Sequence, residues 1–151
     1  MKTALSITLI TLLLGLQLTA TGTNSEEDSI KQTIISAYQE GLINNGDTKA
    51  VLRGFHPGFN LLIKRENMLD KLPIYNWIQS TEEKVKAGRL PRKDKAKFSF
   101  PLVDITKDTA VVKVHFSMAN KLVFTDYLLL YRFNDGWKIV SKVYHKHEQS
   151  G

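Results

Sequence analysis

The final third of the chain decides the fold, because four long β-rich runs follow one another there with only short turns between them. These runs are Lys97–Ile105 (KFSFPLVDI), Thr109–Met118 (TAVVKVHFSM), Leu122–Phe133 (LVFTDYLLLYRF) and Trp137–His145 (WKIVSKVYH). The pairs between them are Lys107-Asp108, Asn120-Lys121 and Asp135-Gly136. Strand-forming runs joined by two-residue turns are typical of hairpins, so the pattern predicts an antiparallel meander.

Helical periodicity precedes this meander. Ser25 and the acidic residues that follow it, up to Asp28, supply a capping side chain and favourable charges for a helix N-terminus. One apolar stripe then recurs at helical spacing: Ile30, Ile34, Ala37, Tyr38 and Leu42. Asn44-Asn45-Gly46 predicts the end of this helix, because asparagine and glycine tolerate the left-handed conformation there. Asp47 predicts the cap of a short second helix that carries Val51, Leu52 and Phe55.

A turn, a short hairpin and a third helix are expected between the second helix and the meander. His56-Pro57-Gly58 should end the second helix, since proline disfavours helix at the residue before it. Extended segments are expected at Asn60–Ile63 and Met68–Leu72, around a turn at residues 65–67. Pro73 suits the first turn of the third helix. The apolar face of that helix would hold Ile74, Trp77, Ile78 and Val85. Helices followed by a closing meander indicate one α+β domain, over residues 25–147.

The N-terminus has the pattern of a cleavable signal peptide. Met1-Lys2 is a short basic start, residues 4–18 carry no charge, and the small residues Ala20-Thr21-Gly22 follow. This succession is typical of export signals. A membrane span wants about 20 predominantly apolar residues, and polar side chains such as Gln17 interrupt this run. We therefore expect residues 1–22 to be removed, with no stable membrane insertion afterwards, and the mature protein to be periplasmic or secreted.

Composition excludes some chemistry. The chain has no cysteine, so thiolate nucleophiles and cysteine metal sites are excluded. Lys and Arg number 21 against 15 Asp and Glu, and much of the excess lies in Lys84–Lys97. That segment lacks interleaved aromatic residues and any nucleic-acid motif. It is interpreted as a solvated loop, and no nucleic-acid partner is expected.

The order of these elements resembles the nuclear transport factor 2-like superfamily, and within it the exported, putative lumazine-binding proteins. The local matches are Tyr38 to Leu42 with Asn45-Gly46-Asp47, Phe55-His56-Pro57, Leu72-Pro73-Ile74 with Trp77-Ile78, Phe124 to Leu128, and Trp137 to His145. The resemblance implies a cystatin-like α+β fold, in which a curved antiparallel sheet is wrapped by N-terminal helices into a cone with a pocket. It also implies a homodimer formed through the open face of the sheet.

The last hairpin can be interpreted geometrically. A two-residue turn at Asp135-Gly136 would set Leu128 opposite Val143 and Asp126 opposite His145. This face is mostly apolar, so we assign it to the concave side and place Lys142 outward. A carboxylate beside an imidazole can serve as a general acid or base, but we favour the interpretation of a structural pair that satisfies two polar groups. His115 is placed outward, because a bulge or an odd loop is needed to keep the apolar residues of this strand on the core side: Val112, Val114, Phe116 and Met118.

The remaining candidates are ligand contacts. Tyr38, Phe55, His56, Trp77, Phe124, Asp126, Leu128 and His145 are predicted to line the ligand pocket. His145 and His147 share one strand face and Asp126 could join them, but no firm third ligand is evident, so no metal is expected.

The ketosteroid isomerases of the superfamily use a pocket tyrosine on the first helix and a base carboxylate on the first strand. Tyr38 matches the tyrosine region, but Asn60–Lys64 offers no carboxylate, so that mechanism is not expected.

Two hypotheses for function follow. The first is a non-enzymatic pocket protein, without a cofactor, that binds a small, partly aromatic molecule. The alternative is an isomerase, dehydratase or cyclase that uses Asp126 with His145.

Overall fold

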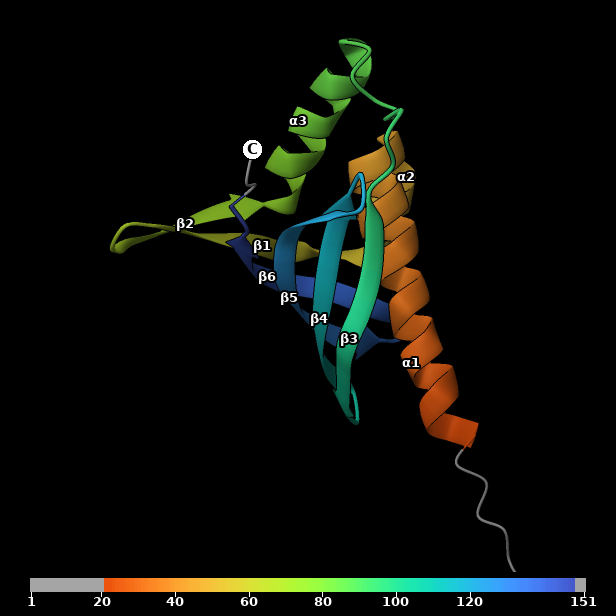
Figure 1. Ribbon diagram of the computed structural model, residues 1–151. Helices are drawn as coiled ribbons and strands as arrows, with labels where there is room; N and C mark the ends of the chain where they lie inside the picture. Colours follow the sequence, from red (N-terminus) through yellow and green to blue (C-terminus); the bar gives the residue numbers. More distant parts are fainter. Residues whose placement is uncertain (1–20, 149–151) are drawn as a thin grey trace, which may run out of the picture.

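The computed structural model describes residues 21–148, and a strongly curved six-stranded sheet dominates them (Figure 1). The strands are β1 (Phe55–Arg65), β2 (Met68–Pro73), β3 (Lys97–Thr106), β4 (Thr109–Met118), β5 (Lys121–Phe133) and β6 (Gly136–Lys146). Their order is β2-β1-β6-β5-β4-β3, and only the β1–β6 pair is parallel. The predicted meander is therefore confirmed as β3 to β6, and the chain has an α+β fold with an unclosed sheet.

The helices cover one side of this sheet. α1 (Thr21–Thr33) continues into the wider, π-helical segment η1 (Ile34–Asn45), and α2 (Thr48–Gly54) folds back beside η1. α3 (Ile74–Lys86) follows β2 and packs against β1. Figure 1 shows α1 and α2 alongside the sheet and α3 standing above the β1–β2 hairpin. None of these helices is long and apolar enough to cross a membrane, so residues 21–148 contain no candidate span.

The turn between η1 and α2 forms as its residues predict. Gly46 ends η1 with φ 75°, in the left-handed region that favours glycine. A Cβ atom at this position would also lie 2.4 Å from Cγ2 of Val85, so any other residue here would force the Val85 side chain to move. The Asp47 carboxylate accepts a hydrogen bond of 3.1 Å from the backbone N–H of Ala50 and so caps α2.

The core lies between the helices and the concave face of the sheet. The helices contribute the predicted stripe from Ile30 to Leu42, and every member of that stripe is buried. The sheet contributes alternate residues of its long strands: Val112, Val114, Leu128, Leu130 and Ile139. His115 lies on the opposite face, and a bulge after Phe116 provides the register that this placement requires.

A second bulge, in β6, changes which residues face inward, and our predicted register is wrong there. The turn residues are 134–135, and Phe133 opposes Gly136. Leu130 opposes Ile139, but Leu129 opposes Ser141, so one extra residue, Val140, is inserted. Because side chains alternate between faces, a one-residue insertion exchanges the faces of every later residue. Leu128 consequently opposes Lys142, not Val143.

Smaller differences concern the ends of the elements. Phe55 begins β1 instead of lying on α2, and Leu52 and Val85 are 50% and 40% exposed, not buried. The turn between β4 and β5 comprises residues 119–120, one residue earlier than predicted. The predicted signal peptide falls almost entirely on residues 1–20, outside the described residues, and stays a prediction.

Candidate functional site

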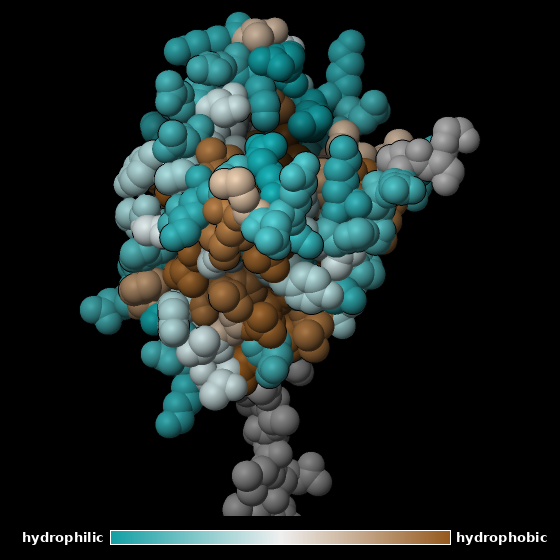
Figure 2. Space-filling model, turned by 90° about the vertical axis from the view of Figure 1, so that its left-hand side faces the viewer, coloured by the Kyte–Doolittle hydropathy of each residue, from teal (hydrophilic) through white to brown (hydrophobic). Residues whose placement is uncertain are grey.

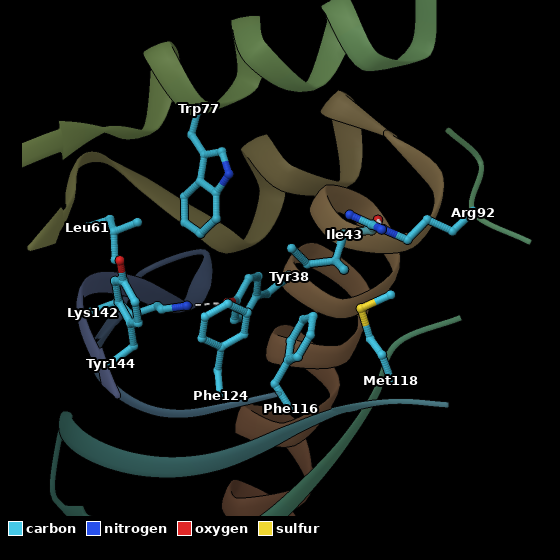
Figure 3. A pocket seen from close by; sticks show the side chains of 10 residues that line it. All are labelled: Tyr38, Ile43, Leu61, Trp77, Arg92, Phe116, Met118, Phe124, Lys142 and Tyr144. Atoms are coloured by element: carbon cyan, nitrogen blue, oxygen red, sulfur yellow. Dashed lines mark hydrogen bonds between the residues drawn. The ribbon is translucent and has the colours of Figure 1, made fainter. Parts of the chain in front are cut away.

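A pocket of about 250 Å³ opens between α3, η1 and the ends of strands β4 to β6 (Figure 3). Its lining is largely aromatic and aliphatic. The residues are Tyr38, Ile43, Leu61, Trp77, Arg92, Phe116, Met118, Phe124, Lys142 and Tyr144. In Figure 3, Lys142 and Arg92 lie at opposite ends of this pocket, with the aromatic side chains between them. An apolar cavity with a few placed polar groups is the usual form of a small-molecule site.

One end of the pocket is closed by a buried polar cluster. The Lys142 ammonium group donates to Oδ2 of Asp126 at 2.8 Å and also to the Tyr38 hydroxyl oxygen. The Tyr38 hydroxyl donates to the same Asp126 oxygen at 2.8 Å. Asp126 is wholly buried, Tyr38 is 2% exposed and Lys142 is 5% exposed. The cluster therefore joins η1, β5 and β6 through one carboxylate.

Aromatic rings surround the Lys142 ammonium group. Its Nζ atom lies 4.6 Å from the ring centre of Tyr38, 5.3 Å from that of Tyr144 and 5.6 Å from that of Trp77. Ring faces attract a cation, and together with Asp126 they replace part of the water that burial removes. Burial lowers the pKa of Lys142 from its usual value, and the neighbouring Asp126 opposes that shift.

Burial also raises the pKa of Tyr38 well above its usual value of 10.0. The nearby Asp126 carboxylate acts in the same direction, because a second negative charge beside it is unfavourable. The hydroxyl is thus held in its neutral form, as a donor to Asp126. Oδ1 of Asp126 is buried and has no hydrogen-bond partner among the described residues.

The walls of the pocket form a connected set of rings. Tyr38 contacts Phe98 at 4.9 Å and Trp77 at 5.8 Å between ring centres. Phe116 and Phe124 lie 5.3 Å apart, and Phe124 continues to Tyr144 at 5.6 Å. These rings come from η1, from α3 and from the four adjacent strands β3 to β6, so only the folded chain assembles them.

Arg92 reaches the other end of the pocket from the loop between α3 and β3. Its backbone N–H donates to the Asn44 carbonyl at 2.8 Å, and its Nε–H donates to the Ile43 carbonyl at 2.9 Å. The buried Asn44 side chain holds the same loop, because its amide exchanges two hydrogen bonds with the backbone of Ala96. The basic segment that we interpreted as a solvated loop is therefore pinned to the end of η1.

Five of the eight predicted pocket residues fall into two groups. Tyr38, Trp77 and Phe124 line the pocket. Phe55 and Leu128 are buried in the core, Phe55 beside the rings of Tyr38 and Trp77.

Asp126 and His145, by contrast, are not brought together. Asp126 opposes Tyr144, while His145 opposes Thr125 on the exposed face, so the predicted pairing is wrong because of the β6 bulge. His145 instead packs its ring against His147 at 4.8 Å. His56 accepts a hydrogen bond from the Gly58 N–H and stacks on Phe133, away from the pocket lining. Within residues 21–148, no group of three histidine, aspartate or glutamate side chains is placed to hold a metal ion.

Sequence reasoning missed Lys142 and Arg92. Strict alternation from Trp137 and Ile139 places residue 142 outward, and no residue near Val140 signals the bulge. Arg92 was one of many cations in its segment, and only the hydrogen bonds to η1 single it out.

The curved sheet, the covering helices and the pocket between them define a protein of the nuclear transport factor 2-like class. Residues 25–145 match the family described as "Putative lumazine-binding", and the chain belongs to this family. No curated protein matches the chain.

Solved structures share the fold. A nuclear transport factor 2-like protein of unknown function from Silicibacter pomeroyi superposes with a TM-score of 0.68 and is 21% identical, over 83% of this chain and 98% of that one. One of unknown function from Shewanella baltica gives 0.65 and 22%, over 85% and 99%. A protein from Streptomyces avermitilis described as a putative dehydratase of this fold gives 0.56 and 14%, over 83% and 99%. At these identities the likeness shows the fold alone.

Tyr38 is expected to ionise only when the protein unfolds. A raised pKa stabilises the folded state fully below the usual value of 10.0, and this contribution is lost as the pH rises through the folded-state pKa. An alkaline titration followed by tyrosinate absorbance should therefore show a last step that coincides with loss of circular dichroism.

Two variants identify that step. Tyr38→Phe should remove its absorbance and cost about 1–3 kcal/mol, because a buried hydrogen-bond donor is lost. Tyr75→Phe, at a side chain that is 55% exposed, should leave the last step intact. If all the tyrosines of the wild-type protein titrate before unfolding, the assignment is wrong.

Proposed function

We propose that this protein is an exported, non-enzymatic binding protein that holds a small, partly aromatic molecule in the pocket lined by Tyr38 and Lys142, and that it acts as a homodimer. The single observation that supports this most is the composition of the pocket. Its walls are aromatic or aliphatic, and its buried polar cluster is satisfied mainly by its own members. The description of the family, which refers to lumazine, a flat heterocycle, agrees with such a ligand.

The separation of Asp126 from His145 leaves the acid–base alternative without its proposed pair. Asp126 is bonded to Lys142 and Tyr38, and His145 is exposed on the other face of the sheet. A general base needs access to the proton that it removes. Asp126 is buried within its hydrogen-bonded cluster, and His145 lies on the face of the sheet away from the pocket, so the two cannot act together on a ligand there. Binding without chemistry is therefore the function that we favour.

Ligand binding can be tested by blocking the pocket. Met118 lies on its wall, so Met118→Trp should fill part of the cavity and reduce lumazine binding at least about tenfold, a loss of ~1.4 kcal/mol. Isothermal titration of the wild-type protein and the variant with lumazine measures this, and mass spectrometry of the purified protein searches for a retained molecule.

Leu52→Trp is the matched control, because Leu52 is exposed on α2. It should bind as the wild-type protein does. Lumazine that is recovered chemically unchanged supports binding over catalysis. Equal lumazine binding by the two variants, or conversion of the bound molecule, would contradict the proposal.

The outer face of the sheet supports the homodimer. Figure 2 shows a broad area of apolar side chains on this side of the molecule. Large apolar residues of β3, β5 and β6 remain exposed there: Leu102, Tyr127, Leu129, Tyr131 and Val143 are each 41–48% exposed. Continuous apolar patches are typical of interfaces, and a twofold dimer covers the same patch on both subunits.

Light scattering after gel filtration tests this dimer. Leu129→Glu puts a charge at the centre of the proposed interface and should convert a dimer into a monomer, because an unpaired charge would be desolvated there. Leu52→Glu should remain dimeric. A wild-type monomer at micromolar concentration, or a dimeric Leu129→Glu variant, would refute this interface.

Export is tested by the mass of the mature protein. When the full chain is produced in a bacterium, the exported fraction should begin near residue 22, because the apolar run and the small residues after it are typical of a cleavage site. Intact-mass measurement of that fraction determines the first residue. A full-length chain that stays inside the cell would contradict the export proposal.

A further inference from the structure

We propose that the natural ligand is an aromatic carboxylate, whose ring system lies between the aromatic walls and whose carboxylate pairs with Arg92. This inference rests on the proposed function and specifies the chemical class of the ligand. It starts from a difference between the two cations of the pocket, which lie at its opposite ends (Figure 3).

Lys142 already has an anionic partner. Its Nζ lies 2.8 Å from Oδ2 of Asp126, and both side chains are almost completely buried. The two formal charges compensate each other, so this end of the pocket is close to neutral. A second anion placed here would repel the Asp126 carboxylate.

Arg92 has no such partner. Its Nε–H donates to the Ile43 carbonyl, and no aspartate or glutamate of residues 21–148 forms an ion pair with it. Glu40, an acidic residue of η1, accepts hydrogen bonds from Gln39, Asn44 and Asn45 instead. The two terminal nitrogens of the guanidinium group therefore keep their donors for a ligand.

The surroundings of Arg92 add positive charge. Burial lowers the pKa of Lys84, and the neighbouring Arg92 and Arg89 lower it further. Because Arg92 and Arg89 lie close enough to Lys84 to disfavour its charged form, the three cations together create a positive potential. This end of the pocket is consequently the place where an anion gains most.

The orientation of Arg92 is fixed before a ligand arrives. Two hydrogen bonds to the end of η1 hold its backbone and its Nε atom, at 2.8 and 2.9 Å. A guanidinium group presents a planar pair of donors that matches a carboxylate, and a side chain that is already ordered loses less entropy on binding. The aromatic walls beside it suit a flat ring better than a flexible chain.

Two probes that differ only in charge test the inference. 2-Naphthoate carries a carboxylate, and 2-naphthamide is its neutral counterpart of nearly the same shape. Isothermal titration of the wild-type protein should show binding of 2-naphthoate about tenfold tighter or more. Arg92→Gln should abolish this preference while binding of the amide changes little.

Arg89→Gln is the matched control, because Arg89 is an exposed cation of the same loop that does not line the pocket. It should keep a clear preference for 2-naphthoate, reduced only by the loss of one neighbouring positive charge, because the donors of Arg92 remain. Circular dichroism verifies the fold of each variant. If Arg92→Gln does not fold, Arg92→Lys keeps the charge, loses the planar pair of donors, and should show a reduced preference.

The outcomes separate this inference from the proposed function. Equal affinity of the wild-type protein for both probes overturns the carboxylate assignment, while pocket binding of lumazine can still hold. A preference that persists in Arg92→Gln, or that disappears in Arg89→Gln, also overturns it. Failure of both probes to bind overturns the assignment of an aromatic carboxylate, and the lumazine titration then decides the proposed function independently.

Discussion

The ion pair between Lys142 and Asp126 is the interaction on which the pocket depends. An isolated charge in an apolar core is very unfavourable, so the ammonium group needs the carboxylate 2.8 Å away, the Tyr38 hydroxyl and the ring faces around it. The carboxylate comes from β5, the hydroxyl from η1 and the ammonium group from β6. Satisfying one buried charge therefore requires η1, β5 and β6 to meet in a single arrangement, and that arrangement leaves the cavity beside it.

The β6 bulge is the backbone feature that makes this ion pair possible. Without the extra residue at Val140, Ser141 and Val143 would face the core and Lys142 would face solvent. With it, Lys142 opposes Leu128 on the concave face and Tyr144 opposes Asp126. A bulge also increases the local twist and bends a strand, which agrees with the curvature of the sheet around the pocket.

The two ends of the pocket differ in their net charge, and this difference makes the site electrostatically asymmetric. The Lys142 end is compensated within the protein, and the Arg92 end is not. A site of this kind orients an asymmetric ligand, because only the Arg92 end attracts an anion. The exposed apolar face of the sheet lies on the opposite side of β4 to β6 from the pocket, so the proposed dimer contact would leave the lining residues free to bind.

Most of the fold followed from local patterns in the sequence, and three of the ten residues that line the pocket were predicted. The turn residues and the alternation of Thr109–Met118 predicted the meander, the stripe from Ile30 to Leu42 predicted the buried helix, and Asp47 predicted a cap. Tyr38, Trp77 and Phe124 were placed at the pocket by their resemblance to a family. These features depend on a few neighbouring residues, or on a pattern that survives small shifts.

Only the tertiary structure determined which polar side chains lie together at the pocket. A one-residue insertion in a strand leaves no mark on composition or on the apolar pattern before it, yet it exchanges the faces of all later residues. The sequence determined that a carboxylate, Asp126, lies on the concave side. The fold decided that its partner is Lys142 and not His145, and that one arginine of a basic loop faces the cavity, because register and loop docking are set by contacts between distant parts of the chain.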